Sequence, residues 1–288
     1  MRAVGWWCRV AESRDALRGE LRDALALYAR MAGISIRGQM QYRVSFALTS
    51  LGQFVTTGVE ILGIWALFDR FGELPNWTLA QVAFFYGVVN VAFSFTDALA
   101  RGFDLFGTEF VKTGEFDRLL LRPRSTVLQL AGHEFVLHRV GRLLQGLLVL
   151  GWAISALDID WNVWRAAMLM YTLAAAFMFF YGLVIFQATL AFWTTESLEI
   201  MNTLSYGGVE AAQFPLAIYH RYFRQLFTYF IPLGCVSYFP VLAILGIDDP
   251  LGSSLAFQVF APCAGFAFFG VALLFWRYGV RHYTSTGS

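Results

Sequence analysis

Long apolar segments alternate with short polar ones along this chain, and this alternation limits what it can fold into. A span of the roughly 30 Å hydrocarbon core takes about 20 apolar residues in a helix. The five clear candidates are Val44–Phe68, Thr78–Ala100, Leu143–Leu157, Val163–Trp193 and Leu255–Trp276. The third of these is short, and we expect it to extend backward through Val136 and Val140. The pattern predicts an all-α polytopic membrane protein.

Composition excludes the main alternatives. Of the 288 residues 58% are hydrophobic and only 14% are charged, whereas soluble domains are about 45–50% apolar. The mean hydropathy is +0.56. The net charge of +1 argues against a nucleic-acid partner, because a phosphate-binding surface needs a concentrated basic excess. The lipid bilayer is therefore the expected environment.

A sixth span is less clear, because prolines and glycines interrupt the chain between Thr194 and Gly246. Two apolar stretches lie there, Ile200–Tyr219 and Leu226–Gly246. Broken backbone is stable at membrane depth only where protein or a wet cavity satisfies its polar groups. We therefore expect one of the two stretches to be re-entrant.

Basic residues predict the sides of the membrane. Eight precede residue 44, five lie in 101–124, two are Arg139 and Arg142, and two are Arg277 and Arg281. These 17 of 21 fall on one side, which the positive-inside rule makes cytoplasmic. The prediction is a cytoplasmic N-terminal segment 1–43, one transmembrane domain 44–276 and a cytoplasmic tail 277–288. Arg70 and Arg165 fall outside, and charge alone does not assign Arg221 and Arg224.

The segment Glu20–Arg43 has the pattern of an amphipathic helix. One half carries apolar side chains, while Arg22, Arg30 and Arg37 cluster on the other. We expect it to lie along the inner membrane interface. A solvated helix that packs on a soluble neighbour is the alternative.

The cytoplasmic loop 101–124 ends in a short predicted helix. Gly114 interrupts the preceding element, Glu115 and Asp117 suit a first helical turn, and Pro123 stops propagation. Leu119 to Leu121 supply an apolar face flanked by charges, which suits a groove on another protein. The residues predicted to make this contact are Glu115, Phe116, Asp117, Arg118, Leu119, Leu120, Arg122 and Pro123.

This stretch, G-E-F-D-R-L-L-L-R-P, resembles the coupling-helix region of the ABC type-2 exporter permease family, in particular a poorly characterised bacterial branch. Later motifs match the same branch in order and spacing, so that the resemblance covers nearly the whole chain. They are Phe192-Trp193-Thr194-Thr195-Glu196, Gly207-Gly208, Gln213 to Tyr219, Ile231-Pro232 and Tyr238-Phe239-Pro240.

The resemblance implies a fold and a set of partners. It implies six spans, an interfacial elbow helix at Glu20–Arg43, a coupling helix near Glu115–Arg122 and outer re-entrant helices before the last span. It favours Ile200–Tyr219 as the fifth span and places Arg221–Pro240, with both its arginines, outside. The localisation implied is the bacterial inner membrane.

It also implies that the chain is a transport subunit and no enzyme. Separate ATPase subunits would dock on the coupling helix, and a second permease would complete the pathway, as a heterodimer in preference to a homodimer. The sequence has no G-x-x-x-x-G-K-[ST] phosphate loop. No cofactor is therefore expected in this chain, since the partner would bind ATP and Mg²⁺.

Ionisable residues within the spans are candidates for the translocation path, because they are costly there unless they face a cavity or a partner. Glu60 and Glu210 have no local partner in sequence, so path lining and interhelical hydrogen bonding both stay open. Asp97 is four residues before Arg101, which predicts a local ion pair. Gln53, Asn90 and Asn202 are expected to join helices.

His133 and His138 suggest a zinc site at first sight, but their spacing differs from H-E-x-x-H. A step of five residues turns the second imidazole to another face of a helix, and the three cysteines have no paired spacing. No metal site is therefore predicted. The alternatives to a permease are an intramembrane lipid-modifying enzyme, with Glu60, Glu210 or His133 as acid or base, and a passive channel or scaffold.

Overall fold

The computed structural model describes residue 23 and residues 26–72, 77–136, 139–194 and 207–285. Within these ranges the regular elements are helices, with no strand among them. Four segments are long and apolar enough to cross a membrane, by length and composition: Arg43–Arg70, Leu79–Leu99, Val163–Leu190 and Leu255–His282. The predicted all-α polytopic membrane protein is confirmed.

The clear spans lie close to their predicted positions. Helices α2 (Arg43–Phe71), α3 (Leu79–Leu99) and α8 (Val163–Leu190) match the first, second and fourth segments. Helix α7 (Val140–Ala156) is the short third segment; it extends backward to Val140 as expected but does not include Val136. The last segment is divided into α13 (Leu255–Phe260) and α14 (Cys263–His282) around Pro262.

Polar side chains set the helix starts. Thr78 and Gln81 form a capping box at the start of α3, Asn162 caps α8 and Ser254 caps α13. Each accepts a hydrogen bond from a backbone N–H that has no partner within the helix. These caps explain why the helices begin at the polar ends of the apolar segments.

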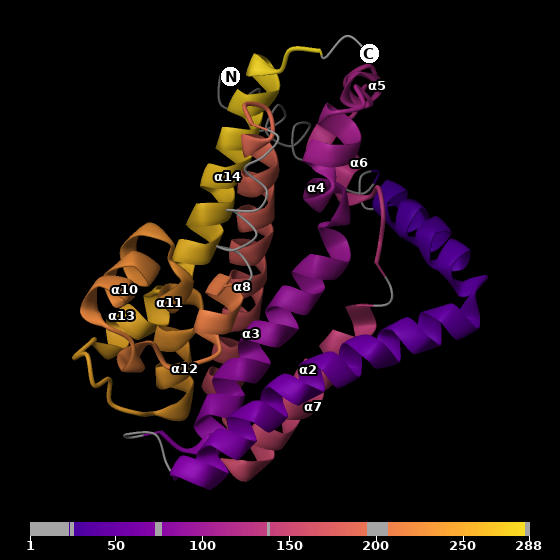
Figure 1. Ribbon diagram of the computed structural model, residues 1–288. Helices are drawn as coiled ribbons and strands as arrows, with labels where there is room; N and C mark the ends of the chain where they lie inside the picture. Colours follow the sequence, from indigo (N-terminus) through magenta and orange to yellow (C-terminus); the bar gives the residue numbers. More distant parts are fainter. Residues whose placement is uncertain (1–22, 24–25, 73–76, 137–138, 195–206, 286–288) are drawn as a thin grey trace, which may run out of the picture.

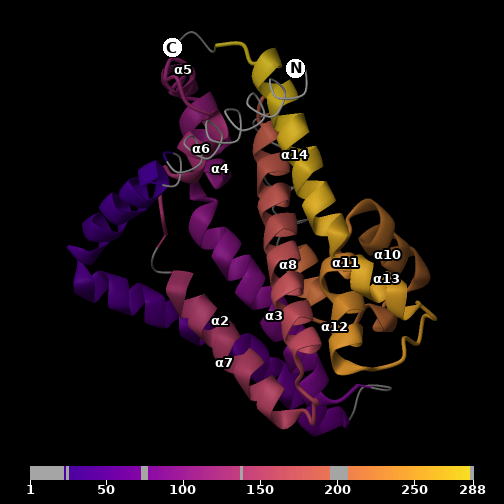
Figure 2. The same cartoon turned by 180° about the vertical axis from the view of Figure 1, so that it is seen from behind.

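Small residues let the long helices pack closely, as is common between membrane helices. A Cβ on Gly87 of α3 would lie 2.7 Å from Cβ of Leu150 on α7, and one on Gly141 of α7 would lie 2.0 Å from the Ser50 carbonyl oxygen on α2. Helix α3 consequently lies at the centre, between α7 and α8, while α8 runs beside α14 (Figures 1 and 2).

The segment after α8 is the most irregular part. Residues 207–212 are helical, the chain turns at Gln213, and Leu216–Ile218 form one 3₁₀ turn. The predicted fifth span, Ile200–Tyr219, thus lies partly outside the described residues and is no continuous helix up to Tyr219. The described residues hold four candidate spans, or up to five with a bent pair. The count of six stays a prediction.

The bent pair is the region predicted to be re-entrant. It contains α10 (Arg221–Gln225), a π-helical segment Leu226–Phe230, α11 (Leu233–Val236) and α12 (Tyr238–Leu245). Its halves meet at 72°. Pro232 lies at the break, where it supplies no backbone N–H. Together with α13 these helices form a cluster beside the start of α14 (Figure 1).

The other end of the bundle carries short helices: α4 (Arg101–Asp104), a π-helical segment Phe106–Val111, α5 (Phe116–Leu120) and α6 (Thr126–Ala131). Figure 1 shows them beside the end of α14, far from the α10–α13 cluster. The helix 26–40 leaves α2 at a turn at residues 41–42. In the part described, Arg30 and Arg37 are exposed while Tyr28 and Met31 are partly buried, as the amphipathic pattern predicts.

Candidate functional site

Helix α5 is attached to the bundle by aromatic side chains. Gly114, with φ of 73°, allows the turn that precedes it. The Phe116 ring is fully buried, with its centroid 5.0 Å from Phe106 and 5.0 Å from Tyr283. Trp276 on α14 lies 4.9 Å from Phe106 and donates a hydrogen bond to Thr126 of α6. The packed rings connect α5 to the cytoplasmic end predicted for α14.

The tail after α14 also holds α5. Ser285 Oγ donates a 2.6 Å hydrogen bond to Oδ2 of Asp117. Partial burial and then the Asp117 carboxylate raise the pKa of Tyr283 above its usual value. Two residues of the tail thus contact one turn of α5.

The outer surface of α5 differs from the prediction in one respect. Leu119 is 8% exposed and packs inward with Phe116, so it does not contribute to the outward apolar face. That face is formed by Leu120, 42% exposed, and Leu121, 85% exposed. Glu115 and Arg118 flank it with a 3.6 Å ion pair, and Arg122 and Pro123 are exposed. The inward shift of Leu119 follows from helical spacing, because residues three apart share a face.

A cavity of about 300 Å³ lies beside α5, between it and the helix 26–40. Met31, Phe110, Arg118, Arg122 and His133 are among its lining residues. His133 packs edge-on against Phe110, with centroids 4.8 Å apart. Within the described residues no group of three or more His, Cys, Asp or Glu is placed to hold a metal ion; His138 lies outside them.

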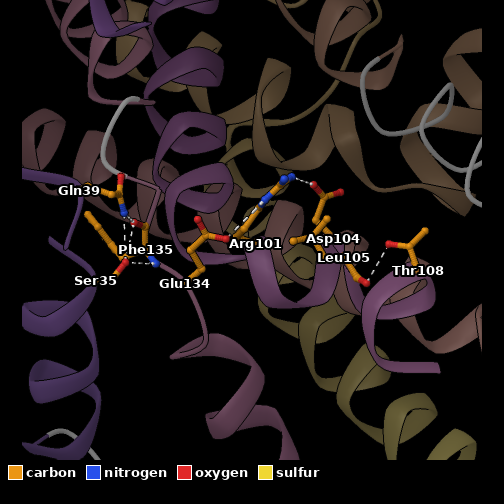
Figure 3. A network of polar contacts seen from close by, with 8 residues as sticks. All are labelled: Ser35, Gln39, Arg101, Asp104, Leu105, Thr108, Glu134 and Phe135. Atoms are coloured by element: carbon orange, nitrogen blue, oxygen red, sulfur yellow. Dashed lines mark hydrogen bonds and ion pairs between the residues drawn. The ribbon is translucent and has the colours of Figure 1, made fainter. Parts of the chain in front are cut away.

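Ion pairs connect the ends of α3, α4 and α7. Asp97 pairs with Arg139, and both are largely buried. The predicted pair of Asp97 with Arg101 is wrong: Arg101 lies 2.9 Å from Asp104 and 3.9 Å from Glu134 (Figure 3). The partner of Asp97 comes from the start of the next long apolar helix, because Arg139 lies directly before α7.

Figure 3 also shows how the helix 26–40 is held. Ser35 Oγ donates to the Phe135 carbonyl at 3.1 Å and accepts from the Phe135 N–H at 3.1 Å, and Gln39 also donates to that carbonyl. The elbow region is therefore fixed to the segment before α7.

A polar cluster lies inside the helix bundle. The Tyr86 hydroxyl on α3 is within hydrogen-bonding distance of three oxygens: the Thr57 carbonyl at 3.1 Å, Glu60 Oε2 at 3.2 Å and Gln145 Oε1 at 3.3 Å. Tyr86 and Gln145 are buried and Glu60 is partly buried. Among the described residues, the buried Nε2 of Gln145 has no hydrogen-bond partner. The cluster thus offers a donor that the described part of the chain leaves unsatisfied.

Arg142 extends the cluster from α7 to α3. Its Nε and Nη2 donate to Oδ1 of Asn90 at 3.1 and 2.9 Å, and its guanidinium lies 4.9 Å from the Phe93 ring centroid. Arg142 is 9% exposed, so its side chain is buried between the helices. Asn90 joins two helices as expected, and Asn202 lies outside the described residues.

Glu210 approaches the same cluster from the segment after α8. Its carboxylate lies close enough to interact with the charges of Glu60 and Arg142, and Gln213 lies beside it. The two predicted path residues, far apart in sequence, are therefore neighbours. Glu210 is exposed in the single chain, whereas Glu60 accepts a hydrogen bond from the Tyr86 hydroxyl.

Comparison with known proteins assigns the chain to a family. Residues 54–287 match the sequence profile described as ABC-2 family transporter protein. The chain belongs to the ABC-2 transporter family. No curated protein and no solved structure matches it.

For this ABC-2 protein, sequence alone predicted a docking segment at 115–123 and named Glu60 and Glu210 as path candidates, but it did not predict the cluster of Tyr86, Arg142 and Gln145. The spacing of these residues could have indicated the cluster. Tyr86 and Asn90 are four residues apart, and Arg142 and Gln145 are three apart. Such spacings place polar side chains on one face of each helix.

Proposed function

We propose that this protein is the permease subunit of an ATP-driven bacterial exporter. Its termini lie in the cytoplasm and its spans in the inner membrane. Separate ATPase subunits, which bind ATP and Mg²⁺, dock on α5, and a second, related permease completes the pathway. Membership in the ABC-2 family supports the transport role.

The observation that carries the proposal is the construction of α5. Its outward surface presents two exposed leucines beside charged residues. On its inner surface, Phe116 packs against Phe192, which follows α8, and against Trp276 on α14. An apolar patch with a charged rim is suited to a groove on a partner. A push on α5 would move α4 and α14 with it, because the packed rings deform little.

The polar cluster is the proposed part of the translocation path. Charged and amide groups at that depth are costly unless they serve a cavity or a partner. The charges of Glu60, Glu210 and Arg142 interact there from three separate elements, so a shift of one helix against another changes their distances. The cluster thus offers polar groups whose exposure depends on conformation.

The surface of α2 supports a second permease beside the lipid. Only 17% of the most apolar stretch of α2 is buried within the chain, whereas the value for α3 is 78%. The exposed positions follow helical spacing along one face: Val44, Leu48, Leu51, Val55, Val59 and Leu62. A related chain or lipid can cover this face, and the heterodimer is the arrangement that the family resemblance favours.

Co-purification tests the docking surface. A tagged full-length chain is expressed in its own cells and purified from membranes, and ATPase chains that come with it are identified. Leu121→Asp is expected to remove the ATPase. Val163→Asp is the matched control, because Val163 is as exposed (87%) but lies at the start of α8, at the opposite end. An ATPase retained equally by both variants would contradict docking at α5.

A further inference from the structure

A second cavity lies within the α10–α13 cluster, far from α5 (Figure 1). Its volume is about 400 Å³, and it opens between α10, the π-helical segment Leu226–Phe230 and the start of α13. Its lining includes Arg221, Arg224, Thr228, Tyr229, Ser254 and Phe257. The polar cluster described above contributes none of its lining residues.

The side chains of its two arginines make no hydrogen bond or ion pair within the described part of the chain. Arg221 is exposed and Arg224 is half-buried. These are the two arginines that the charge rule left unassigned. Two guanidinium groups beside one cavity favour an anion, and planar guanidinium binds phosphate oxygens in pairs.

The cavity's carboxylate does not neutralise them by direct contact. Asp249 accepts hydrogen bonds from the Tyr238 hydroxyl at 2.7 Å, from the Leu251 N–H at 2.9 Å and from the Ser253 N–H at 3.1 Å. Its oxygens are thus used to hold the turn that precedes α13. The arginine donors remain available to a ligand.

The surroundings of the cavity are apolar and aromatic. Tyr229 is 77% and Phe230 80% exposed, and α13 adds Leu255, 64% exposed, and Phe260, 70% exposed. An exposed apolar surface beside a cationic cavity suits an amphipathic ligand. The anionic head of the ligand would lie in the cavity, and its apolar chain would pack against the aromatic rings.

We propose that this cavity binds the phosphate headgroup of an anionic lipid. Arg221 and Arg224 contact the phosphate oxygens, while Tyr229, Phe230 and Phe260 contact the acyl chains. Lipid binding at this cavity does not depend on the proposed function. Inorganic phosphate shares the headgroup chemistry but lacks the chains.

The test uses the full-length protein, purified in a neutral detergent without any ATPase. Binding of dioctanoyl phosphatidylglycerol is measured by titration calorimetry, in parallel with dioctanoyl phosphatidylcholine and inorganic phosphate. The anionic lipid is expected to bind about tenfold or more tightly than either, because charge-assisted hydrogen bonds and apolar contact act together. Equal affinity for the zwitterionic lipid, or for inorganic phosphate, would overturn the proposal.

Variants locate the site. Arg221→Gln/Arg224→Gln is expected to weaken binding of the anionic lipid about tenfold or more, whereas Arg70→Gln, at the end of α2, leaves it unchanged. Ser254 offers a second pair of variants, since Asn and Asp both replace Ser well as a helix cap. Ser254→Asp adds a negative charge beside the arginines and is expected to bind about fivefold or more weakly than Ser254→Asn. If the double arginine variant folds poorly, the two Ser254 variants still test the site. Equal binding of the anionic lipid by Ser254→Asp and Ser254→Asn, or by the double arginine variant and Arg70→Gln, would overturn the proposal.

Discussion

The ring of Phe116 on α5 meets the ring of Tyr283 in the tail edge to face, with centroids 5.0 Å apart. This contact joins the middle of the chain to its end at one side of the bundle. Phe106 and Trp276 complete the same packed group. It explains how a helix of only five residues is held to the bundle.

Phe116→Ala should uncouple α5 from the bundle. Removing a fully buried phenyl ring costs about 3–5 kcal/mol of stability, so we expect a lower midpoint of thermal unfolding and weaker stimulation of ATP hydrolysis by the permease. Leu120→Ala is the control, since Leu120 is 42% exposed and its loss should leave the midpoint nearly unchanged. A similar midpoint for both variants would show that Phe116 is no anchor.

Asn90→Leu should destabilise the polar cluster. The change leaves the guanidinium of Arg142 buried without its two bonds, and hydrogen bonds to charged groups contribute about 1.5–3 kcal/mol. Adding Arg142→Met should recover most of the loss, because no buried charge then remains. Thermal unfolding in detergent measures both, and additive losses in the double variant would argue against direct coupling.

Exchange of charges tests the pair of Asp97 and Arg139. Each of Asp97→Arg and Arg139→Asp alone leaves like charges facing each other and should lower expression and the unfolding midpoint. The double exchange should restore part of both, since the attraction returns with reversed sign. Asp104→Asn, at a partly exposed ion pair with Arg101, should have a smaller effect. No recovery in the double variant would mean that the two side chains do not depend on each other.

Glu210→Gln should lower transport more than stability. Glu210 is exposed in the single chain, so the neutral amide should cost little on unfolding, while removal of its charge changes the proposed path. Glu60→Gln keeps an acceptor for Tyr86 and separates the effect of charge from that of the hydrogen bond. The measurement is substrate-stimulated ATP hydrolysis by the reconstituted complex, beside the unfolding midpoint. Full stimulation in both variants would remove these residues from the path.

The long helices were predictable from sequence because hydrophobicity and length determine them. The span Thr78–Ala100 differs from α3 only by its caps, and Gly114 and Pro123 limit the region of α5 as expected. The partners of polar groups were not predictable in the same way. Asp97 binds Arg139 on another helix, and Leu119 turns inward because the rings of α14 and the tail lie there.

The most direct test of the proposed docking is photo-crosslinking from Leu121. Benzoylphenylalanine is placed at position 121 or, as the control, at position 163, in cells that express the complete complex. The account predicts an ATPase chain crosslinked from position 121 and none from position 163. An intact complex in which position 121 yields no ATPase adduct would contradict it.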